Sequence, residues 1–142
     1  DEPTTALDVT VQAQILELIN ELKSKLNSAV IMISHDLGVV SEVADKVAVM
    51  YSGRIVEYAD VHAIFNEPKH PYTKGLIEAI PDIDMDRQQR LKEIRGVVPF
   101  PGEIKEGCRF KTRCDCAKKN CIIEEPPLIQ VGSNHVRCWN YA

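Results

Sequence analysis

Two adjacent carboxylates, Asp1 and Glu2, open the sequence. Adjacent carboxylates that follow a strand point in different directions, so one can hold Mg²⁺ through water while the other polarises an attacking water. Most acidic pairs of this kind are solvated surface groups. Asp1 and Glu2 are therefore candidates for metal-assisted hydrolysis that need support from other parts of the pattern.

A third candidate, His35, follows the most apolar run of the sequence, residues 29–33. The run is short and rich in β-branched residues, which predicts a strand buried on both faces, as in a parallel sheet. Ligands bind at the carboxyl ends of such strands in open α/β sheets, so His35 is a candidate ligand contact. The alternative is a structural histidine, or a helix cap formed by Ser34.

All five cysteines lie in the last 35 residues: Cys108, Cys114, Cys116, Cys121 and Cys138. An odd count without a secretory signal argues against a disulfide scaffold, and clustered thiols in such a chain more often hold a metal. The spacing has no tight C-x-x-C knuckle and matches no common ferredoxin pattern. It therefore supports a four-thiolate site for Zn²⁺ or an iron–sulfur cluster, with free thiols as the alternative.

The elements that would position these groups follow from the periodicity of apolar residues. After Asp8 they recur with a helical period, so we predict a helix over residues 9–27, with Thr4, Thr5 or Asp8 as its N-cap. The apolar run described above follows this helix as a strand.

Beyond His35 the sequence predicts a short helix over residues 37–44 and then two strands, residues 46–51 and 54–58. Ser-Gly at positions 52 and 53 is a turn signal that makes these strands a hairpin. The order helix, strand, helix, strand, turn, strand predicts an α/β fold whose sheet is partly parallel and ends in an antiparallel hairpin.

Two short helices are expected next. The first covers residues 60–65 with Asp60 as its cap. Pro71 suits the first position of the second, which runs to Ile80. His70 precedes it and lacks partners at a catalytic spacing, so we interpret it as structural.

The rest of the chain divides by composition. Residues 82–95 are charged and are expected to be helical around Leu91 and Ile94. Three Gly and two Pro among residues 96–107 predict a linker. Residues 108–142 form a cysteine module that is too small to bury much core and is expected to need a metal or a neighbour.

The chain begins with Asp-Glu-Pro-Thr-Thr-Ala-Leu-Asp, and Ile-Ser-His-Asp-Leu follows the first helix. This combination, over residues 1–59, resembles the C-terminal half of an ABC-type nucleotide-binding domain. The resemblance implies that Asp1 ends the Walker B motif and helps to bind Mg²⁺, and that Glu2 is the general base for ATP hydrolysis. It implies that Asp8 belongs to the D-loop, which contacts the partner domain of a dimer, and that His35 is the switch histidine at the γ-phosphate. Water would attack that phosphate in line.

Glu-Pro-Lys-His-Pro-Tyr-Thr-Lys-Gly-Leu, at residues 67–76, resembles the hallmark of oligopeptide and dipeptide importer ATPases. The fold expected from both resemblances is the second half of a P-loop NTPase sheet, a helical extension over residues 60–95, the linker and the cysteine module. That module resembles an extension of these ATPases in which four cysteines hold a [4Fe–4S] cluster, with Zn²⁺ as the alternative. The implied ligands are Cys108, Cys114, Cys121 and Cys138, with Cys116 as a possible substitute for Cys114.

The 142 residues contain neither a G-x-x-x-x-G-K-[ST] phosphate loop nor a Leu-Ser-Gly-Gly-Gln signature, and they begin without Met. We therefore expect a fragment of an ATP-hydrolysing subunit. Because the phosphate loop supplies the amides and the Lys that hold the nucleotide, the fragment alone is expected to be inactive. The alternative function is a metal- or cluster-binding interaction or dimerisation module.

Charge and hydropathy limit the partners. With 17 basic and 21 acidic side chains, the net charge of −4 gives no support for nucleic-acid binding. No apolar run approaches the roughly 20 residues of a membrane span, and there is no signal peptide. The resemblance implies a peripheral protein on the cytoplasmic face of a prokaryotic membrane. Its implied partners are a second ABC ATPase subunit, transmembrane permease subunits and, indirectly, a peptide-binding protein. Self-association through exposed apolar surface is also expected.

Overall fold

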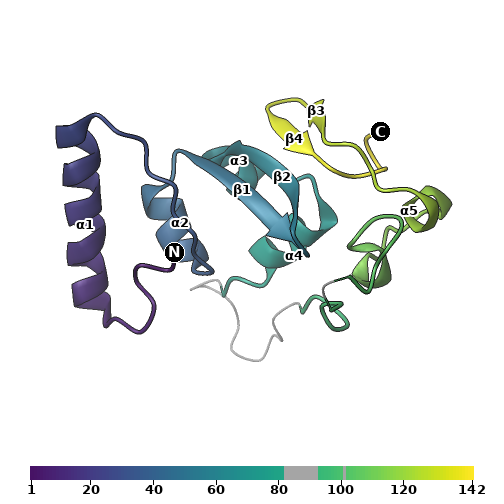
Figure 1. The fold of residues 1–142 in the computed structure, drawn as a ribbon, viewed down its shortest axis with the longest axis horizontal. Coiled ribbons are helices and arrows are strands. Elements are labelled where there is room, and N and C mark those ends of the chain that lie inside the picture. The colour runs from purple at the N-terminus through teal and green to yellow at the C-terminus, as the bar shows by residue number, and fades with distance from the viewer. Residues whose placement is uncertain (82–92, 101) are drawn as a thin grey trace. The chain divides into compact units, whose positions relative to one another are not determined.

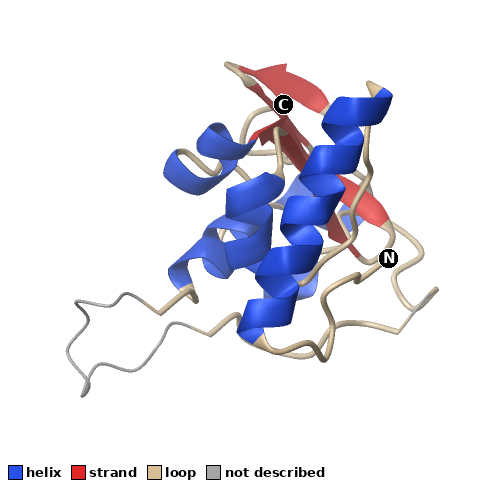
Figure 2. Cartoon of the chain, turned by 90° about the vertical axis from the view of Figure 1, so that its left-hand side faces the viewer, coloured by secondary structure: helices blue, strands red, loops and turns tan. Residues whose placement is uncertain are grey.

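The computed structural model describes residues 1–81, 93–100 and 102–142. These residues form two compact units, Asp1–Asp45 and Lys46–Ala142. Figure 1 gives the order of the elements along the chain, and Figure 2 shows that helices and strands both contribute. The mixed α/β class is therefore confirmed. The helix expected around Leu91 lies outside the described residues.

The first unit is built on the predicted long helix, α1 (Val9–Leu26). Of the three candidate caps, Asp8 is the one used, because its side chain accepts hydrogen bonds from the backbone N–H groups of Thr10 and Val11. These bonds satisfy donors that have no partner inside the helix. The helix ends at Asn27, which adopts the left-handed conformation that often closes helices.

The segment between α1 and α2 (Leu37–Val43) is a loop in Figure 1, so the prediction of a buried strand over residues 29–33 is wrong. Ile31 is 94% exposed. A strand needs a ladder of backbone hydrogen bonds to a neighbour. Among the described residues, one backbone hydrogen bond reaches residues 29–33, from the N–H of Glu2 to the carbonyl of Ile33 at 2.9 Å. The apolar pattern is present, but the partner strands are not.

The helix α2 begins directly after Asp36, two residues after His35. The Asp36 side chain caps it by accepting hydrogen bonds from the backbone N–H groups of Gly38 and Val39. Ser34, which the sequence offered as an alternative cap, instead accepts a hydrogen bond from the backbone N–H of Asp36. The turn between the loop and α2 therefore fixes the backbone around His35.

The second unit contains a four-stranded sheet. β1 (Lys46–Tyr51) and β2 (Arg54–Asp60) form the predicted hairpin, and β3 (Ile129–Val131) and β4 (Asn134–Val136) form another. The sheet order is β1-β2-β4-β3. Every strand pairing within the described part of the chain is antiparallel, so the partly parallel sheet is not found. The neighbour of the predicted hairpin is β4, from the far end of the sequence.

Short helices complete the second unit: α3 (Val61–Asn66), α4 (Pro71–Glu78), η1 (Lys111–Arg113) and α5 (Lys119–Ile123). α3 follows Asp60 as expected, although the Asp60 side chain makes no capping hydrogen bond. α4 begins at Pro71 as predicted and ends at Glu78, two residues before the expected Ile80.

Aromatic rings form the core of the second unit. Tyr51 and Phe110 are buried with Val56, and Tyr72 packs against them. The ring of Tyr51 lies 5.1 Å from that of Phe110 and 4.8 Å from that of Tyr72, centroid to centroid, in edge-to-face arrangements. Because Phe110 comes from the cysteine-rich end, that end shares a core with the hairpin and α4.

Candidate functional site

The structure brings Glu2 and His35 together, although 33 positions separate them in the sequence. His35 Nδ1 lies 2.9 Å from Glu2 Oε1, and the hydroxyl of Thr5 donates to Glu2 Oε2, also at 2.9 Å. When Nδ1 carries the ring proton, His35 donates to the carboxylate and Nε2 keeps a lone pair for another group. The hydrogen bond from His35 holds the pKa of Glu2 below its usual value, and the bond from Thr5 adds to this.

The backbone of Glu2 adopts a conformation that is rare outside glycine, with φ at 40°. Two hydrogen bonds hold it there. Its N–H donates to the carbonyl of Ile33 at 2.9 Å, and its carbonyl accepts from the N–H of Thr5 at 3.2 Å. Such strain persists only where surrounding contacts enforce it, and it is concentrated at functional sites.

The site is open to solvent. The side chains of His35 and Glu2 are 73% and 44% exposed. A carboxylate with this access can reach a water molecule or a bound ligand, because each of its oxygens has a lone pair beyond the hydrogen bond already made.

The other two acidic candidates are not hydrogen-bonded to this pair among the described residues. Asp1 makes no side-chain hydrogen bond or ion pair with any described residue, and its side chain is exposed. Asp8 serves as the cap of α1. Within residues 1–81, 93–100 and 102–142, no group of three His, Cys, Asp or Glu side chains could hold a metal ion. Asp1, Glu2 and His35 therefore do not form a metal site by themselves.

The five cysteines are free thiols that differ in exposure. Cys121 and Cys138 are buried, Cys108 and Cys114 are half-buried, and Cys116 is exposed. The backbone N–H of Cys108 donates to the carbonyl of Cys121 at 2.8 Å, which joins the start of the segment to α5. This contact holds Cys108 and Cys121 together in the second unit.

Burial decides the protonation of these thiols. It raises the pKa of Cys114 to about 11, and the nearby Cys116, Cys138 and Cys108 thiols add to the rise. Burial also raises the pKa of Cys108 and of Cys138, with the neighbouring thiols again adding to it. A basic side chain opposes the rise at Cys138 alone of these three, where Lys118 lowers the pKa but burial outweighs it.

The four-cysteine ligand set stays a prediction. The thiols influence one another electrostatically, but no three of them in the described part of the chain lie close enough to hold one metal ion. As donors they still match the chemistry of Zn²⁺ or an iron–sulfur cluster, both of which bind thiolate sulfur.

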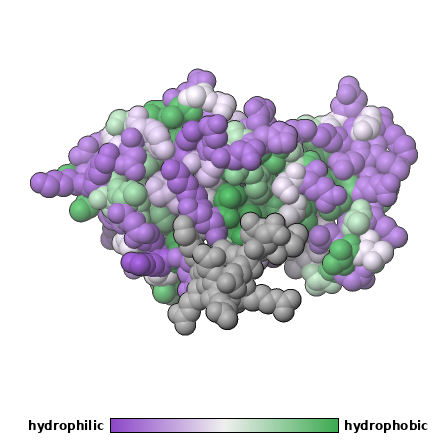
Figure 3. Space-filling model, turned by 180° about the vertical axis from the view of Figure 1, so that it is seen from behind, coloured by the Kyte–Doolittle hydropathy of each residue, from purple (hydrophilic) through white to green (hydrophobic). Residues whose placement is uncertain are grey.

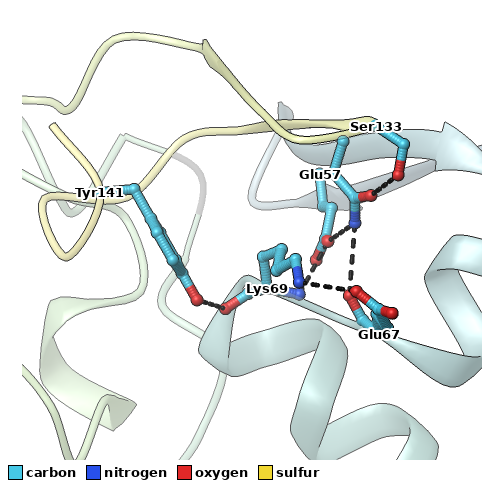
Figure 4. Close-up of polar contacts among 6 residues, drawn as sticks. Glu57, Glu67, Lys69, Ser133 and Tyr141 are labelled. Carbon is cyan, nitrogen blue, oxygen red and sulfur yellow. Dashed lines mark hydrogen bonds and ion pairs between the residues drawn. The ribbon is translucent and has the colours of Figure 1, made fainter.

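A buried carboxylate that the sequence analysis missed lies in β2. Glu57 is 0% exposed, and it accepts hydrogen bonds from the backbone N–H groups of Lys69 and His70, both at 2.8 Å, and from Asn134 Nδ2 at 2.7 Å. Figure 4 shows the hydrogen bond from Lys69 to Glu57, together with the hydrogen bond from the Tyr141 hydroxyl to the Lys69 carbonyl. The only signal in the sequence is one Glu within the apolar run Ile-Val-Glu-Tyr-Ala.

His70 is structural, as predicted. Its Nδ1 accepts a hydrogen bond from the backbone N–H of Tyr72 at 3.0 Å, which caps α4. Burial lowers the pKa of His70 to about 4, and the Glu57 carboxylate opposes part of that shift. The imidazole is therefore neutral at pH 7, as an acceptor at this position requires.

Hydrophobic side chains are scattered over the surface. On the face seen in Figure 3, hydrophobic atoms lie among hydrophilic ones. None of the helices in the described part of the chain has the length and apolar character needed to cross a membrane.

Comparison with known proteins agrees with the resemblance found in the sequence. The family described as "Oligopeptide/dipeptide transporter, C-terminal region" matches residues 56–121, which include most of β2, all of α4 and three of the four expected cysteine ligands. The oligopeptide transport ATP-binding protein AppD of Bacillus subtilis is 51% identical over 142 residues, which is 99% of this chain and 43% of AppD. The dipeptide transport ATP-binding protein DppD of Escherichia coli is 51% identical over 128 residues, which is 90% of this chain and 39% of DppD.

The chain is therefore similar to the ATP-binding proteins of peptide transport. It spans about two fifths of the length of these relatives, and corresponds to their C-terminal region. The matched family range begins after the site at Glu2 and His35, whereas the similarity to the peptide-transport ATP-binding proteins extends over nearly the whole chain.

Proposed function

We propose that this chain is part of an ATP-hydrolysing subunit that powers the import of oligopeptides or dipeptides across a membrane. In this proposal Asp1 helps to bind the Mg²⁺ of the nucleotide, Glu2 is the general base towards the attacking water, and His35 contacts the γ-phosphate. Asp8 lies in the loop that meets a partner ATPase domain. The Mg²⁺ ion supplies neutralisation of the phosphate charge, and the residues of this chain supply the base and its orientation.

The contact between Glu2 and His35 is the observation that carries this proposal. A solvated surface carboxylate needs neither a strained backbone nor two side-chain donors, and Glu2 has both. A carboxylate that is held in place, ionised and open to water has the properties of a general base. A histidine whose Nδ1 is engaged by that carboxylate presents Nε2 to a ligand beside it.

The proposal is tested by replacing Glu2 in the full-length protein, because the 142 residues contain no phosphate-loop sequence. Glu2→Gln keeps the shape of the side chain and removes its basicity. We expect ATP hydrolysis to fall by roughly 10²–10⁴-fold, the range that general bases contribute, with ATP binding retained. His35→Ala is expected to reduce hydrolysis as well.

Glu17→Gln is the matched control, since Glu17 is an exposed residue of α1 outside the site. It should hydrolyse ATP at the unaltered rate. Hydrolysis by Glu2→Gln at a rate close to that of the unaltered protein would contradict the proposed role of Glu2. Mg²⁺-dependent hydrolysis by the isolated 142 residues would contradict the expectation that they are inactive alone.

The proposed partners and location follow from the relatives. AppD and DppD are named as ATP-binding proteins of oligopeptide and dipeptide transport, and both come from bacteria. We therefore propose a peripheral subunit at the cytoplasmic face of a prokaryotic membrane, working with a second ATPase subunit, with transmembrane permease subunits and, through them, with a peptide-binding protein.

We also propose that the cysteine-rich end binds a [4Fe–4S] cluster, with Zn²⁺ as the alternative. The supporting observation is that the Cys138 thiol adds to the raised pKa of Cys108 and Cys114, and the Cys121 thiol adds to that of Cys108 and Cys138. Thiolates that repel one another are stabilised together by a shared cation. Cys121 would complete the ligand set, and Cys116 is the possible substitute for Cys114. Such a group would hold the loops of this segment together.

Metal and sulfide analysis of anaerobically purified full-length protein tests this second proposal. We expect iron and sulfide in equal amounts, or one zinc, and we expect Cys138→Ser to abolish the binding. Cys116→Ser is the control that separates the two possible ligand sets, because it should retain the metal if Cys114 is the ligand. Protein that contains neither iron nor zinc after anaerobic handling would show that the thiols are free.

A further inference from the structure

We infer that Thr5 is a positioning residue, which holds the Glu2 carboxylate in the orientation needed to accept a proton from water. This inference rests on the proposed role of Glu2 as the general base. Thr5 itself is not expected to contact the nucleotide or the reacting water. Its hydroxyl acts through Glu2, to which it donates a hydrogen bond of 2.9 Å.

The two oxygens of the Glu2 carboxylate are held by two different donors. His35 Nδ1 is at Oε1 and the Thr5 hydroxyl is at Oε2. A carboxyl group rotates easily about its terminal bond when it is held at one oxygen only, because that torsion is broad. With both oxygens engaged, the plane of the group is fixed. The remaining lone pair of each oxygen then points in a defined direction.

The two donors differ in how they are attached to Glu2. Thr5 lies three residues away, in the turn that is closed by the hydrogen bond from its own N–H to the Glu2 carbonyl. The hydroxyl therefore moves with the Glu2 backbone. His35 belongs to a distant segment, and its ring is 73% exposed. Thr5 is thus the donor that stays in place if the His35 ring turns towards a ligand.

The consequence is a specific effect on turnover. Without the Thr5 hydroxyl, the carboxylate is held at one oxygen, and the fraction of molecules with a correctly oriented base falls. Misplaced catalytic groups lower the rate of the chemical step. A hydrogen bond to a charged but exposed group corresponds to roughly a 3- to 10-fold effect. We expect kcat to fall by that factor while KM for ATP stays unchanged.

Thr5→Val in the full-length protein is the test, because valine has the shape of threonine without the hydroxyl. The expected result is a kcat about 3- to 10-fold lower, an unchanged KM, and recovery of kcat in Thr5→Ser, which restores a donor. Thr10→Val is the matched control. Thr10 is exposed in α1, its side chain makes no hydrogen bond to the described residues, and the variant should keep the original kcat.

Three results would overturn the inference. Thr5→Val with unaltered kcat would show that the hydroxyl is not needed. A raised KM with unaltered kcat would show that Thr5 contacts the nucleotide instead. Failure of Thr5→Ser to restore kcat would show that the shape of the side chain matters and the donor does not.

Glu2→Gln separates this inference from the proposed function. If Glu2→Gln abolishes hydrolysis and Thr5→Val has no effect, the general base stands and only the role of Thr5 fails. If Glu2→Gln hydrolyses ATP normally, the proposed function fails, and the role of Thr5 fails with it.

Discussion

Glu2 in the first unit and Glu57 in the second are both glutamates held by hydrogen bonds, yet their surroundings differ. The Glu2 carboxylate receives two side-chain donors, and its side chain remains 44% exposed. The Glu57 carboxylate receives three donors and is 0% exposed. Both are positioned, but only Glu2 can still meet a water molecule or a ligand.

The difference shows that satisfaction by hydrogen bonds does not by itself identify a catalytic carboxylate. A buried carboxylate with all its donors inside the protein connects segments, as Glu57 connects β2, the start of α4 and β4. A carboxylate with donors on one side and solvent on the other can do chemistry. The family match begins within β2, so it includes Glu57 but not Glu2.

The largest expected effect on stability comes from Glu57→Gln. The amide presents one oxygen and one NH₂ group to three donors, so at least one buried N–H loses its acceptor, and the charged acceptor is lost as well. We expect the free energy of unfolding to fall by about 3–4 kcal/mol, measured by urea denaturation. Glu106→Gln, at an exposed position, is the control and should differ little from the unaltered protein. Equal urea-denaturation midpoints for Glu57→Gln and Glu106→Gln would show that the buried network around Glu57 contributes nothing to stability.

The next effect is a dependence of stability on pH that comes from His70. Its pKa is lowered from 6.5 to about 4 in the folded protein, so the unfolded chain binds a proton first as the pH falls. Stability is therefore complete above pH 6.5, decreases between pH 6.5 and 4, and loses up to about 3 kcal/mol from this residue.

His70→Asn tests the origin of that dependence, because asparagine can cap α4 but does not titrate. Urea denaturation at pH 7, 5.5 and 4 should show a smaller loss of stability in the variant than in the unaltered protein. If the variant and the unaltered protein lost the same stability as the pH falls, titratable groups other than His70 would cause the loss.

A smaller effect is expected for Asn134→Ala. The substitution removes one of the three donors to Glu57 and leaves the two backbone donors in place, so we expect a loss of about 1–2 kcal/mol. Combining it with Glu57→Gln in a double-mutant cycle should give less than the sum of the two effects, because both changes break the same contact. Simple additivity would show that the two residues do not interact.

The smallest effect on stability should come from Glu2→Gln. Its carboxylate lies in an open turn, and we expect the denaturation midpoint to stay unchanged while hydrolysis by the full-length protein collapses. A fall in the midpoint similar to that of Glu57→Gln would remove the distinction between the two glutamates, since Glu2 would then be a structural residue as well.

Local features of the fold were predictable because short-range chemistry decides them. Three examples are the cap at Asp8, the turn at Ser52 and Gly53, and the start of α4 at Pro71. Each depends on residues that are close to one another in the sequence. The structural role of His70 was also predicted. The segment at residues 29–33 was not, because an apolar pattern specifies a strand only where neighbouring strands pair with it.

By itself, the sequence determined the residue types that can do chemistry and their order along the chain: a carboxylate pair, a histidine after an apolar run, and clustered thiols. Only the tertiary structure decided which of them meet. It placed His35 Nδ1 on Glu2. It also buried Glu57 against β4 and α4, and raised the pKa of Cys108, Cys114 and Cys138 through burial. The physical reason is that desolvation and long-range hydrogen bonds depend on surroundings that come from distant parts of the chain.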